Sequence, residues 1–460
     1  MRRTARRTAS KPEPRHGRLA CPKLGCGAER LHPPSAPSFR AALRFWWKLG
    51  WISFGGPSGQ IAILHREVVE RKRWLDEDAF LRGLSFCTLL PGPEAQQLAT
   101  YVGWRLHGTL GGVAAGALFV LPGAAVLVAL SWLSVLGRDV GWVGALFDGL
   151  RPAVIALVAG ALWRIGSRAL RTRALWAVAL AAFALQLAQL ASFPWLVFGA
   201  LALGALLSRA RPAWFGKPAH AAAAAASATS ARAAPRPLAV LGACLALWWA
   251  PVGALAWWLG ARSLHVALAL FFSQAAVVTF GGAYAVLPYV AEHAVASGWL
   301  APGEMMHGLA LAETTPGPLI LVIQHVGFVG GWNLPGELSR ESAALLGAAI
   351  STWVTFVPCF LLILLGAPHV ERLGSRPAIA AALAAVTAVN VAVIASLLVW
   401  FARAALWQRE LGRGIDAHVD WIALAIAALA LLALQRRWCE APLLVAACAL
   451  LGLARHALTA

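Results

Sequence analysis

Long apolar runs are the feature that most constrains how this chain can fold. A helix needs about 20 apolar residues to cross the hydrocarbon core of a bilayer, and several runs exceed that length. Of the 460 residues, 60% are hydrophobic and 13% are charged, whereas a soluble domain carries about 25% charged residues. The sequence therefore predicts an all-α polytopic membrane protein. The runs span 110–136, 141–163, 174–208, 238–261, 343–368, 377–402, 419–434 and 441–454.

The formal net charge of +19 has an explanation within this fold class. In a soluble protein such a charge would suggest nucleic acid as a partner. Here the basic residues lie in the termini and loops, where the positive-inside rule places them. We therefore expect the lipid bilayer, and no nucleic acid, to be the partner of these charges.

The seven cysteines are scattered, and most lie in or beside apolar runs, as small packing residues do. Cys21 and Cys26 form a C-x4-C near His16 and His32, a spacing that fits no common zinc pattern. The sequence predicts no metal site and no cofactor.

Composition divides the chain into four parts. Residues 1–39 are basic and lack the apolar core of a signal peptide, so they are expected to be a disordered cytoplasmic tail. An over-called start codon is the alternative. Residues 209–237 contain AAAAAASATS and are expected to be a low-complexity linker. The linker separates a first membrane half, 40–208, from a second, 238–460.

The two halves share landmarks in the same order, which indicates an internal duplication. The first four landmarks recur after 224 to 226 residues, and the fifth recurs after an insertion near 332–342. The pairs are SFGG at 53–56 with TFGG at 279–282, Trp74-Leu75 with Trp299-Leu300, Pro91-Gly92-Pro93 with Pro316-Gly317-Pro318, Gly103 with Gly327, and Pro122 with Pro358.

The charge of one repeated segment predicts how the halves are oriented. Segment 64–82 carries five Lys or Arg residues, whereas its counterpart 290–308 carries none. By the positive-inside rule the two segments lie on opposite sides of the membrane. We therefore expect an inverted-topology repeat with about 10–13 membrane segments, some of them broken or re-entrant. The charged run 65–83 is expected to form one amphipathic cytoplasmic helix.

The repeated Pro-Gly-Pro interrupts a helix twice, where an apolar chain should avoid a break. Two prolines remove two N–H donors and end a helix. Such a break is tolerated in a membrane only where it is covered by protein or lines a cavity. New helices are expected to start at Glu94 and Leu319, with unpaired N–H groups that attract an anion. A kink that serves only packing is the alternative.

The predicted anion site combines both Pro-Gly-Pro breaks with the two Gly pairs, which are read as half-helix ends facing the same cavity. Close helix packing at the Gly pairs is the alternative. The predicted binding residues in these segments are Gly55, Gly56, Pro57, Pro91, Gly92, Pro93, Gly281, Gly282, Thr315, Pro316, Gly317 and Pro318.

A polar stripe follows the first break. Glu94, Gln97, Tyr101 and Arg105 are spaced three, four and four residues apart, which places them on one face of a helix. Charged residues within a membrane are costly unless they face water, each other or a ligand. Gln97, Tyr101 and Arg105 are therefore predicted ligands, since the planar guanidinium of Arg105 suits a tetrahedral oxyanion. The alternative is that Arg105 only reaches the interface.

Three ionisable residues are candidates for proton coupling: Glu94, Glu313 and His325, the last of which aligns with Tyr101. A packed, fully hydrogen-bonded histidine is the alternative for His325. No G-x-x-x-x-G-K-[ST], H-E-x-x-H or G-x-S-x-G motif occurs in the sequence. The sequence therefore predicts a gradient-driven carrier and not an enzyme, with a passive anion channel and a membrane enzyme as rivals.

Two segments resemble the chromate ion transporter (CHR) family in its long, two-domain form. They are 54–108, with FGGPSGQ and LLPGPEAQQ, and 279–331, with TFGGAYA and TTPGPLI. The resemblance covers most of 41–136 and 266–366 and departs at Ala283, where the first half has Pro57.

The resemblance implies a carrier in the bacterial inner membrane that exports chromate, driven by the proton gradient, and confers chromate resistance. Some relatives are associated with sulfate, so sulfate or another oxyanion stays an open alternative. The coupling ion and the oligomeric state, including a homodimer, also stay open.

Overall fold

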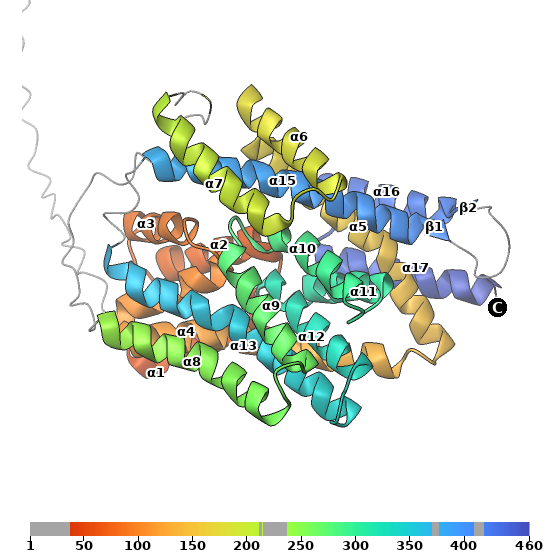
Figure 1. Cartoon of the computed structure of the whole chain (residues 1–460), viewed down its shortest axis with the longest axis horizontal. Coiled ribbons are helices and arrows are strands. Elements are labelled where there is room, and N and C mark those ends of the chain that lie inside the picture. The colour runs from red at the N-terminus through yellow and green to blue at the C-terminus, as the bar shows by residue number, and fades with distance from the viewer. Residues whose placement is uncertain (1–36, 211–213, 215–236, 370–376, 409–417, 460) are drawn as a thin grey trace, which may run out of the picture. The chain divides into compact units, whose positions relative to one another are not determined.

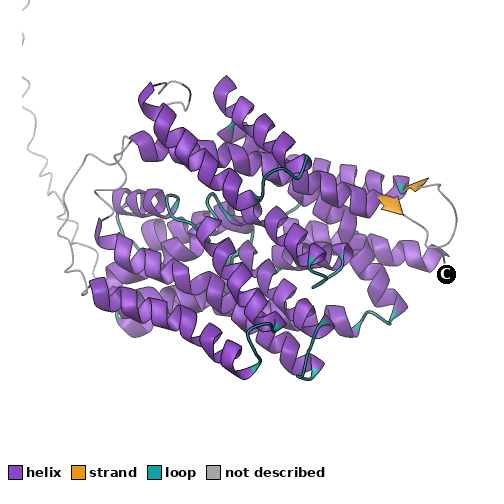
Figure 2. Ribbon diagram, viewed as in Figure 1, coloured by secondary structure: helices purple, strands orange, loops and turns teal. Residues whose placement is uncertain are grey.

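The computed structural model describes residues 37–210, 214, 237–369, 377–408 and 418–459. Most of the predicted tail and linker, with Cys21 and Cys26, lies outside these residues. Within them the chain is helical apart from one pair of two-residue antiparallel strands, in which Trp407 pairs with Val419 and Gln408 with His418. Figure 2 shows helices joined by short loops. The predicted all-α membrane fold is confirmed.

The elements of the first half run from Phe39 to Ala210 (Figure 1). They are α1 (Phe39–Ile52), α2 (Gly56–His65), the π-helix η1 (Arg66–Arg71), α3 (Glu77–Cys87), α4 (Glu94–Leu136), α5 (Gly141–Ala169), α6 (Arg173–Leu187) and α7 (Phe193–Ala210).

The second half begins with a helix that has no counterpart before α1 among the described residues. Its elements are α8 (Pro237–Trp258), α9 (Leu264–Val278), α10 (Ala283–Ala296), α11 (Pro302–Thr314), η4 (Leu319–Leu321), α12 (Val322–Asn333), α13 (Arg340–Gly366), η5 (Ala367–His369), α15 (Pro377–Leu406), β1 (Trp407–Gln408), β2 (His418–Val419), α16 (Trp421–Gln435) and α17 (Ala441–Thr459). The additional helix α8 packs on α9 and α13.

Helix α4 is a helical hairpin. Its backbone leaves helical geometry at His107 and Gly108, where the positive φ of Gly108 (71°) permits the reversal. The two arms then touch through glycines, since a Cβ on Gly103 would collide with the carbonyl oxygen of Gly111. In the second half α12 and α13 form the same hairpin, with Gly327 against Gly347 and a longer connection. The predicted insertion near 332–342 therefore lies at the hairpin tip.

The long helices of the two halves exchange partners. Helix α5 packs on α16 and α17, α15 packs on α6 and α7, and α5 and α15 also contact each other (Figure 1). Small residues permit close contact at both exchanged pairs. A Cβ on Gly149 of α5 would lie 2.9 Å from the Cα of Gly452, and one on Gly204 of α7 would lie 2.5 Å from the Cα of Ala382. Such reciprocal packing is what a two-fold relation between the halves produces.

Six helices among the described residues are long and apolar enough to cross a membrane, and five shorter helices are also apolar. The six are α4, α5, α8, α13, α15 and α17, and α4 contributes two antiparallel arms.

The predicted single amphipathic helix over 65–83 is wrong. Helix α2 passes into the π-helix η1, and the chain then leaves helical structure and bends at Arg73, whose φ is 51°. Helix α3 starts afresh at Glu77, with the Asp76 side chain accepting a hydrogen bond from the N–H of Ala79 as an N-cap. The pattern of charges over 65–83 does not reveal that Asp76 caps a separate helix.

Candidate functional site: crossed helix breaks

The Gly-Gly pairs lie at equivalent breaks in the two halves. Helix α1 ends at Ile52 and α2 begins at Gly56, while α9 ends at Val278 and α10 begins at Ala283. All four glycines have positive φ, a conformation that residues with a side chain rarely adopt. The φ angles are 89° at Gly55, 68° at Gly56, 77° at Gly281 and 96° at Gly282.

The Pro-Gly-Pro segments form the second pair of breaks. Helix α3 ends at Cys87 and α4 starts at Glu94, whereas α11 ends at Thr314 and η4 starts at Leu319. The central glycines are buried and have positive φ, 122° at Gly92 and 94° at Gly317. The predicted helix starts at Glu94 and Leu319 are confirmed.

Each Pro-Gly-Pro segment is hydrogen-bonded to the other half. The N–H of Gly92 donates to the carbonyl of Thr279 at 2.7 Å, and the N–H of Gly317 donates to the carbonyl of Ser53 at 2.9 Å. Ser53 and Thr279 are fully buried. These two bonds satisfy backbone groups that would otherwise be costly inside a membrane. We call this arrangement the crossing: Ser53–Gly56 with Pro316–Pro318, and Thr279–Gly282 with Pro91–Pro93.

Three side-chain amides hold the crossing from neighbouring helices. The Nε2 group of Gln60 donates to the carbonyl of Gly317 at 2.5 Å, and that of Gln97 donates to the carbonyl of Pro91 at 2.7 Å. The Nδ2 group of Asn390 on α15 donates to the carbonyl of Phe280 at 2.6 Å. The amide oxygens of Gln97 and Asn390 are buried and have no hydrogen-bond partner among the described residues.

Sequence reasoning selected Gln97 as an anion ligand, but its donor group is used to hold the break. Gln60 and Asn390 were missed. Each is a lone amide in an apolar segment, and polar residues inside a membrane are a signal for function or for helix–helix bonding. The signal was present at Gln60, which stands directly before the apolar run IAIL, and at Asn390, which stands in the middle of TAVNVAV.

Four helix N-termini meet in two pairs at the crossing. The Gly92 bond brings the start of α4 to the start of α10, and the Gly317 bond brings the start of η4 to the start of α2. First-turn N–H groups carry partial positive charge and suit an anion. Gly55 and Gly281 are exposed, so each pair of termini can be reached from outside the packed core.

The predicted polar stripe lies on the first arm of α4, but its ends are separated. Glu94 is partly buried at the break, and Tyr101 packs closely against Gly83 of α3. Arg105 donates from Nη1 to the Tyr101 hydroxyl at 3.5 Å. Eleven residues of helix separate Glu94 from Arg105, which corresponds to about 16 Å. Arg105 therefore lies near the hairpin tip, away from the break.

Glu313 lies buried just before the second Pro-Gly-Pro. Its Oε1 atom accepts a hydrogen bond from the hydroxyl of Tyr284 on α10, and the positive charge of Arg164 on α5 acts on this pair. Tyr284 and Glu313 are 6% and 7% exposed. A carboxyl group that is hydrogen-bonded to a phenol can take up or release a proton while both side chains stay in place. Sequence reasoning selected Glu313 but not Tyr284.

His325 has partners for both ring nitrogens. Its Nδ1 atom lies 2.8 Å from the Ser131 hydroxyl, and its Nε2 atom lies 3.2 Å from the carbonyl of Glu304. A carbonyl can only accept, so Nε2 carries the proton and Nδ1 accepts from Ser131 in the neutral ring. The ring packs against Gly308, as Tyr101 packs against Gly83. These contacts favour the packed histidine that the sequence left as an alternative.

A basic pocket of about 470 Å³ lies between α1 and η1. Arg44, Lys48, Arg71 and Lys72 line it, together with one carboxylate, Glu67, which pairs with Arg71 at 2.7 Å. The pocket reaches Ile52, the last residue of α1 before the break. Its excess of positive charge attracts anions.

Among the described residues no three His, Cys, Asp or Glu side chains are placed to hold a metal ion.

The fold and the crossing of the described residues define a class of protein. It is a polytopic helical membrane protein of two repeated halves, in which paired helix breaks bring helix N-termini together. Transporters with broken helices place their substrate sites in such regions.

Comparison with known proteins identifies the family. The model of the chromate transporter family matches residues 40–205 and 266–453. The chain belongs to the chromate transporter family. The two matched regions coincide with the two structural repeats, and α8 falls between them.

Individual relatives extend over most of the chain. The chromate transport protein of Pseudomonas aeruginosa is 34% identical over 335 residues, covering 72% of this chain and 73% of its own. The chromate transport protein of Cupriavidus metallidurans is 28% identical over 435 residues, covering 94% and 96%. The probable chromate transport protein of Synechococcus elongatus is 29% identical over 378 residues, covering 82% and 88%. The search of solved structures found no match.

Proposed function

We propose that this protein is a secondary active transporter that exports chromate across the cytoplasmic membrane of a bacterium, driven by the proton gradient, and thereby confers chromate resistance. The observation that carries the proposal is the crossing, in which each half completes the helix break of the other. The names of the three relatives support chromate as the substrate.

The crossing provides the binding chemistry for a tetrahedral dianion. Backbone N–H groups at the starts of α2, α4, α10 and η4 donate to its oxygens, and the helix dipoles balance part of its charge. These donors are neutral backbone groups, so the anion does not have to be separated from a charged side chain when it leaves the site. The basic pocket beside α1 collects the anion from the cytoplasm, with the N-terminal tail on the same side.

The two-fold exchange of partners supports alternating access. In an inverted repeat the two halves present equivalent arrangements to opposite sides of the membrane, and exchanging them moves a fixed central site from one side to the other. The close glycine contacts of α5 with α17 and of α7 with α15 supply flat surfaces along which such a movement can occur.

Glu313 and Tyr284 are the proposed proton carriers, with Glu94 as a second carboxyl group at the other break. Protonation of Glu313 removes a negative charge next to the start of η4, so its protonation state changes the affinity of this end of the site for the anion. Export driven by an inward proton gradient requires antiport, so the proton is carried in the half of the cycle in which the anion is absent. Glu313, neutralised by that proton, then returns in the empty carrier.

The test is uptake of radiolabelled chromate into inside-out vesicles that contain this protein. Accumulation is measured with and without an imposed pH gradient, and with excess sulfate as competitor. We expect accumulation that requires the gradient and that sulfate barely reduces. Vesicles without the protein are the control.

Other outcomes identify the alternatives. Accumulation that sulfate abolishes would make a broader oxyanion the substrate. Flux that equilibrates chromate and ignores the gradient would indicate a passive anion channel.

A further inference from the structure

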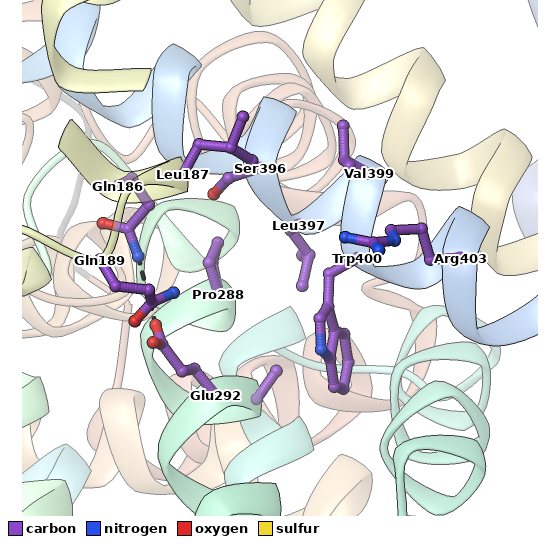
Figure 3. Close-up of a pocket in the computed structure, with 11 residues that line it drawn as sticks. Gln186, Leu187, Gln189, Pro288, Glu292, Ser396, Leu397, Val399, Trp400 and Arg403 are labelled. Carbon is purple, nitrogen blue, oxygen red and sulfur yellow. Dashed lines mark hydrogen bonds between the residues drawn. The ribbon is translucent and has the colours of Figure 1, made fainter. Parts of the chain in front are cut away.

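A second cavity, of about 210 Å³, lies away from the crossing among α6, α10 and α15 (Figure 3). The end of α6 supplies Gln186, α10 supplies Pro288 and Glu292, and α15 supplies Trp400 and Arg403. Residues from both halves therefore form its walls. None of these residues belongs to the proposed chromate site.

Opposite charges line opposite sides of this cavity. Glu292 lies on the side of α6, and Arg403 lies across the cavity beside Trp400 (Figure 3). Neither side chain makes an ion pair with another described residue. Both residues are exposed, so a ligand that carries both charges can reach and contact both.

The negative side also contains an unused buried acceptor. The Nε2 group of Gln186 donates to Glu292 Oε2 at 3.2 Å. Gln186 is only 6% exposed, and its Oε1 atom is buried without a hydrogen-bond partner among the described residues. A buried polar atom without a partner is costly. The carboxylate of Glu292 and this amide oxygen together suit an ammonium group, which has three donors and no acceptor.

The remaining walls include two polar side chains, Gln189 and Ser396, and several apolar ones. Two of the apolar residues, Leu187 and Val399, are 56% and 38% exposed. Helix α6 ends at Leu187, directly before the turn to α7, and the last residues of a membrane helix are the ones closest to the headgroups. Trp400 lies between the two charged sides, a position that indole rings favour at the membrane interface.

We propose that this cavity binds a zwitterionic aminoethyl phosphate, supplied by the headgroup of a phosphatidylethanolamine lipid. The ammonium group binds Glu292 and Gln186, and the phosphate binds the Arg403 guanidinium. The first acyl carbons lie along Leu187 and Val399. Since the cavity joins α6 of the first half to α10 and α15 of the second, the lipid clamps the two halves together. This inference does not depend on the identity of the transported anion.

The test is a native mass spectrometry titration of the purified full-length protein with dihexanoyl phosphatidylethanolamine and dihexanoyl phosphatidylglycerol, which lacks the ammonium group. We expect the ethanolamine lipid to bind about tenfold more tightly, the effect of one charge-assisted contact. Equal affinity of the two lipids for the wild-type protein would overturn the proposal without the need for any variant.

Variants assign the two ends of the ligand. Glu292→Gln should weaken the ethanolamine lipid about tenfold and leave the glycerol lipid unchanged. Arg403→Gln should weaken both lipids, because both contain the phosphate. Glu337→Gln, an exposed carboxylate between α12 and α13, is the matched control and should change neither. Wild-type affinity of Glu292→Gln for the ethanolamine lipid would overturn the assignment.

Free phosphoethanolamine distinguishes the two sources of this headgroup. Binding at least about tenfold weaker than that of the short-chain lipid supports a lipid ligand, since buried acyl carbons add affinity. Equal binding would overturn the lipid source and assign the cavity to a soluble aminoethyl phosphate.

Discussion

The two breaks of the crossing use the same backbone bonds but different ionisable groups. At one, Gly92 donates to Thr279, and at the other Gly317 donates to Ser53, with nearly equal lengths of 2.7 and 2.9 Å. The equivalence extends along the helices, where Gly83 faces Tyr101 and Gly308 faces His325. The backbone framework of the breaks is therefore duplicated.

The carboxyl groups are not duplicated. The first half has Glu94 after its break, where the second half has Leu319. The second half has the Tyr284–Glu313 pair before its break, where the first has Ser58 and Thr88. The proposed anion site is therefore symmetric in its backbone, whereas the proposed proton carriers are not.

The largest effect is expected from the central glycines. Gly92→Ala and Gly317→Ala place a side chain at positive φ, which costs about 1–2 kcal/mol, and at Gly92 the new Cβ would lie 2.7 Å from Cys359 Sγ. We expect each variant to lower the initial rate of chromate uptake by about tenfold or more, as 1.4 kcal/mol corresponds to tenfold. Gly199→Ala, where a Cβ has open space, is the control. Loss in only one of the two variants would break the equivalence of the breaks.

The next effect separates the halves. Glu313→Gln keeps the shape of the buried side chain but removes its proton exchange, so gradient-driven accumulation should fall to the level seen without a gradient. Chromate exchange at equal pH should persist. Glu94→Gln should leave most of the gradient dependence, because Glu94 lacks a tyrosine partner in the described structure. If the Glu94 variant lost coupling and the Glu313 variant kept it, the roles of the two halves would be reversed.

A smaller effect concerns the amides that hold the breaks. Gln60→Leu removes the donor to the Gly317 carbonyl, and Gln97→Leu removes the donor to the Pro91 carbonyl. Each should lower stability by about 1 kcal/mol, seen as a lower midpoint of thermal unfolding in detergent. Gln435→Leu at the exposed end of α16 is the control. Unequal losses would show that one break depends more on its amide than the other.

An effect of similar size lies at a pair of equivalent helix starts. Thr172 caps α6 and Asp420 caps α16, each accepting from the N–H three residues later. Thr172→Ala and Asp420→Ala should each cost about 1 kcal/mol, whereas Asp420→Asn should retain most of the cap. Thermal unfolding of the three variants gives the comparison, and an equal loss in Asp420→Asn would show that charge, and not capping, dominates.

The Asp420 cap depends on pH, whereas the Thr172 cap contains no ionisable group. Burial would raise the pKa of this carboxyl, but hydrogen bonds from Ala423 and Arg455 and the charge of Arg455 hold the pKa below its usual range. The carboxylate therefore stabilises the fold above the unfolded-state pKa of about 4, and this contribution is lost as the pH falls through the folded-state value. Asp420→Asn should remove that dependence.

Much of the candidate site was visible in the sequence because it depends on local chemistry. Pro-Gly-Pro ends a helix wherever it occurs, and Gly-Gly permits positive φ, so both pairs of breaks and the helix starts at Glu94 and Leu319 could be predicted. Tyr284, Gln60 and Asn390 could not be placed, because each contributes through one bond to a distant segment. The bond from Gln60 to Gly317 spans 257 residues.

The sequence by itself determined the membrane fold, the duplication and the positions of the breaks, since apolar length, repeated landmarks and proline chemistry are properties of short segments. Only the tertiary structure decided that each break is completed by the other half and that α5 and α15 exchange their partners. It also decided that Arg105 lies away from the break and that the hydroxyl of Tyr284 donates a hydrogen bond to Glu313. The physical reason is that buried backbone groups in a membrane must find partners somewhere, and which partner they find depends on how whole helices pack.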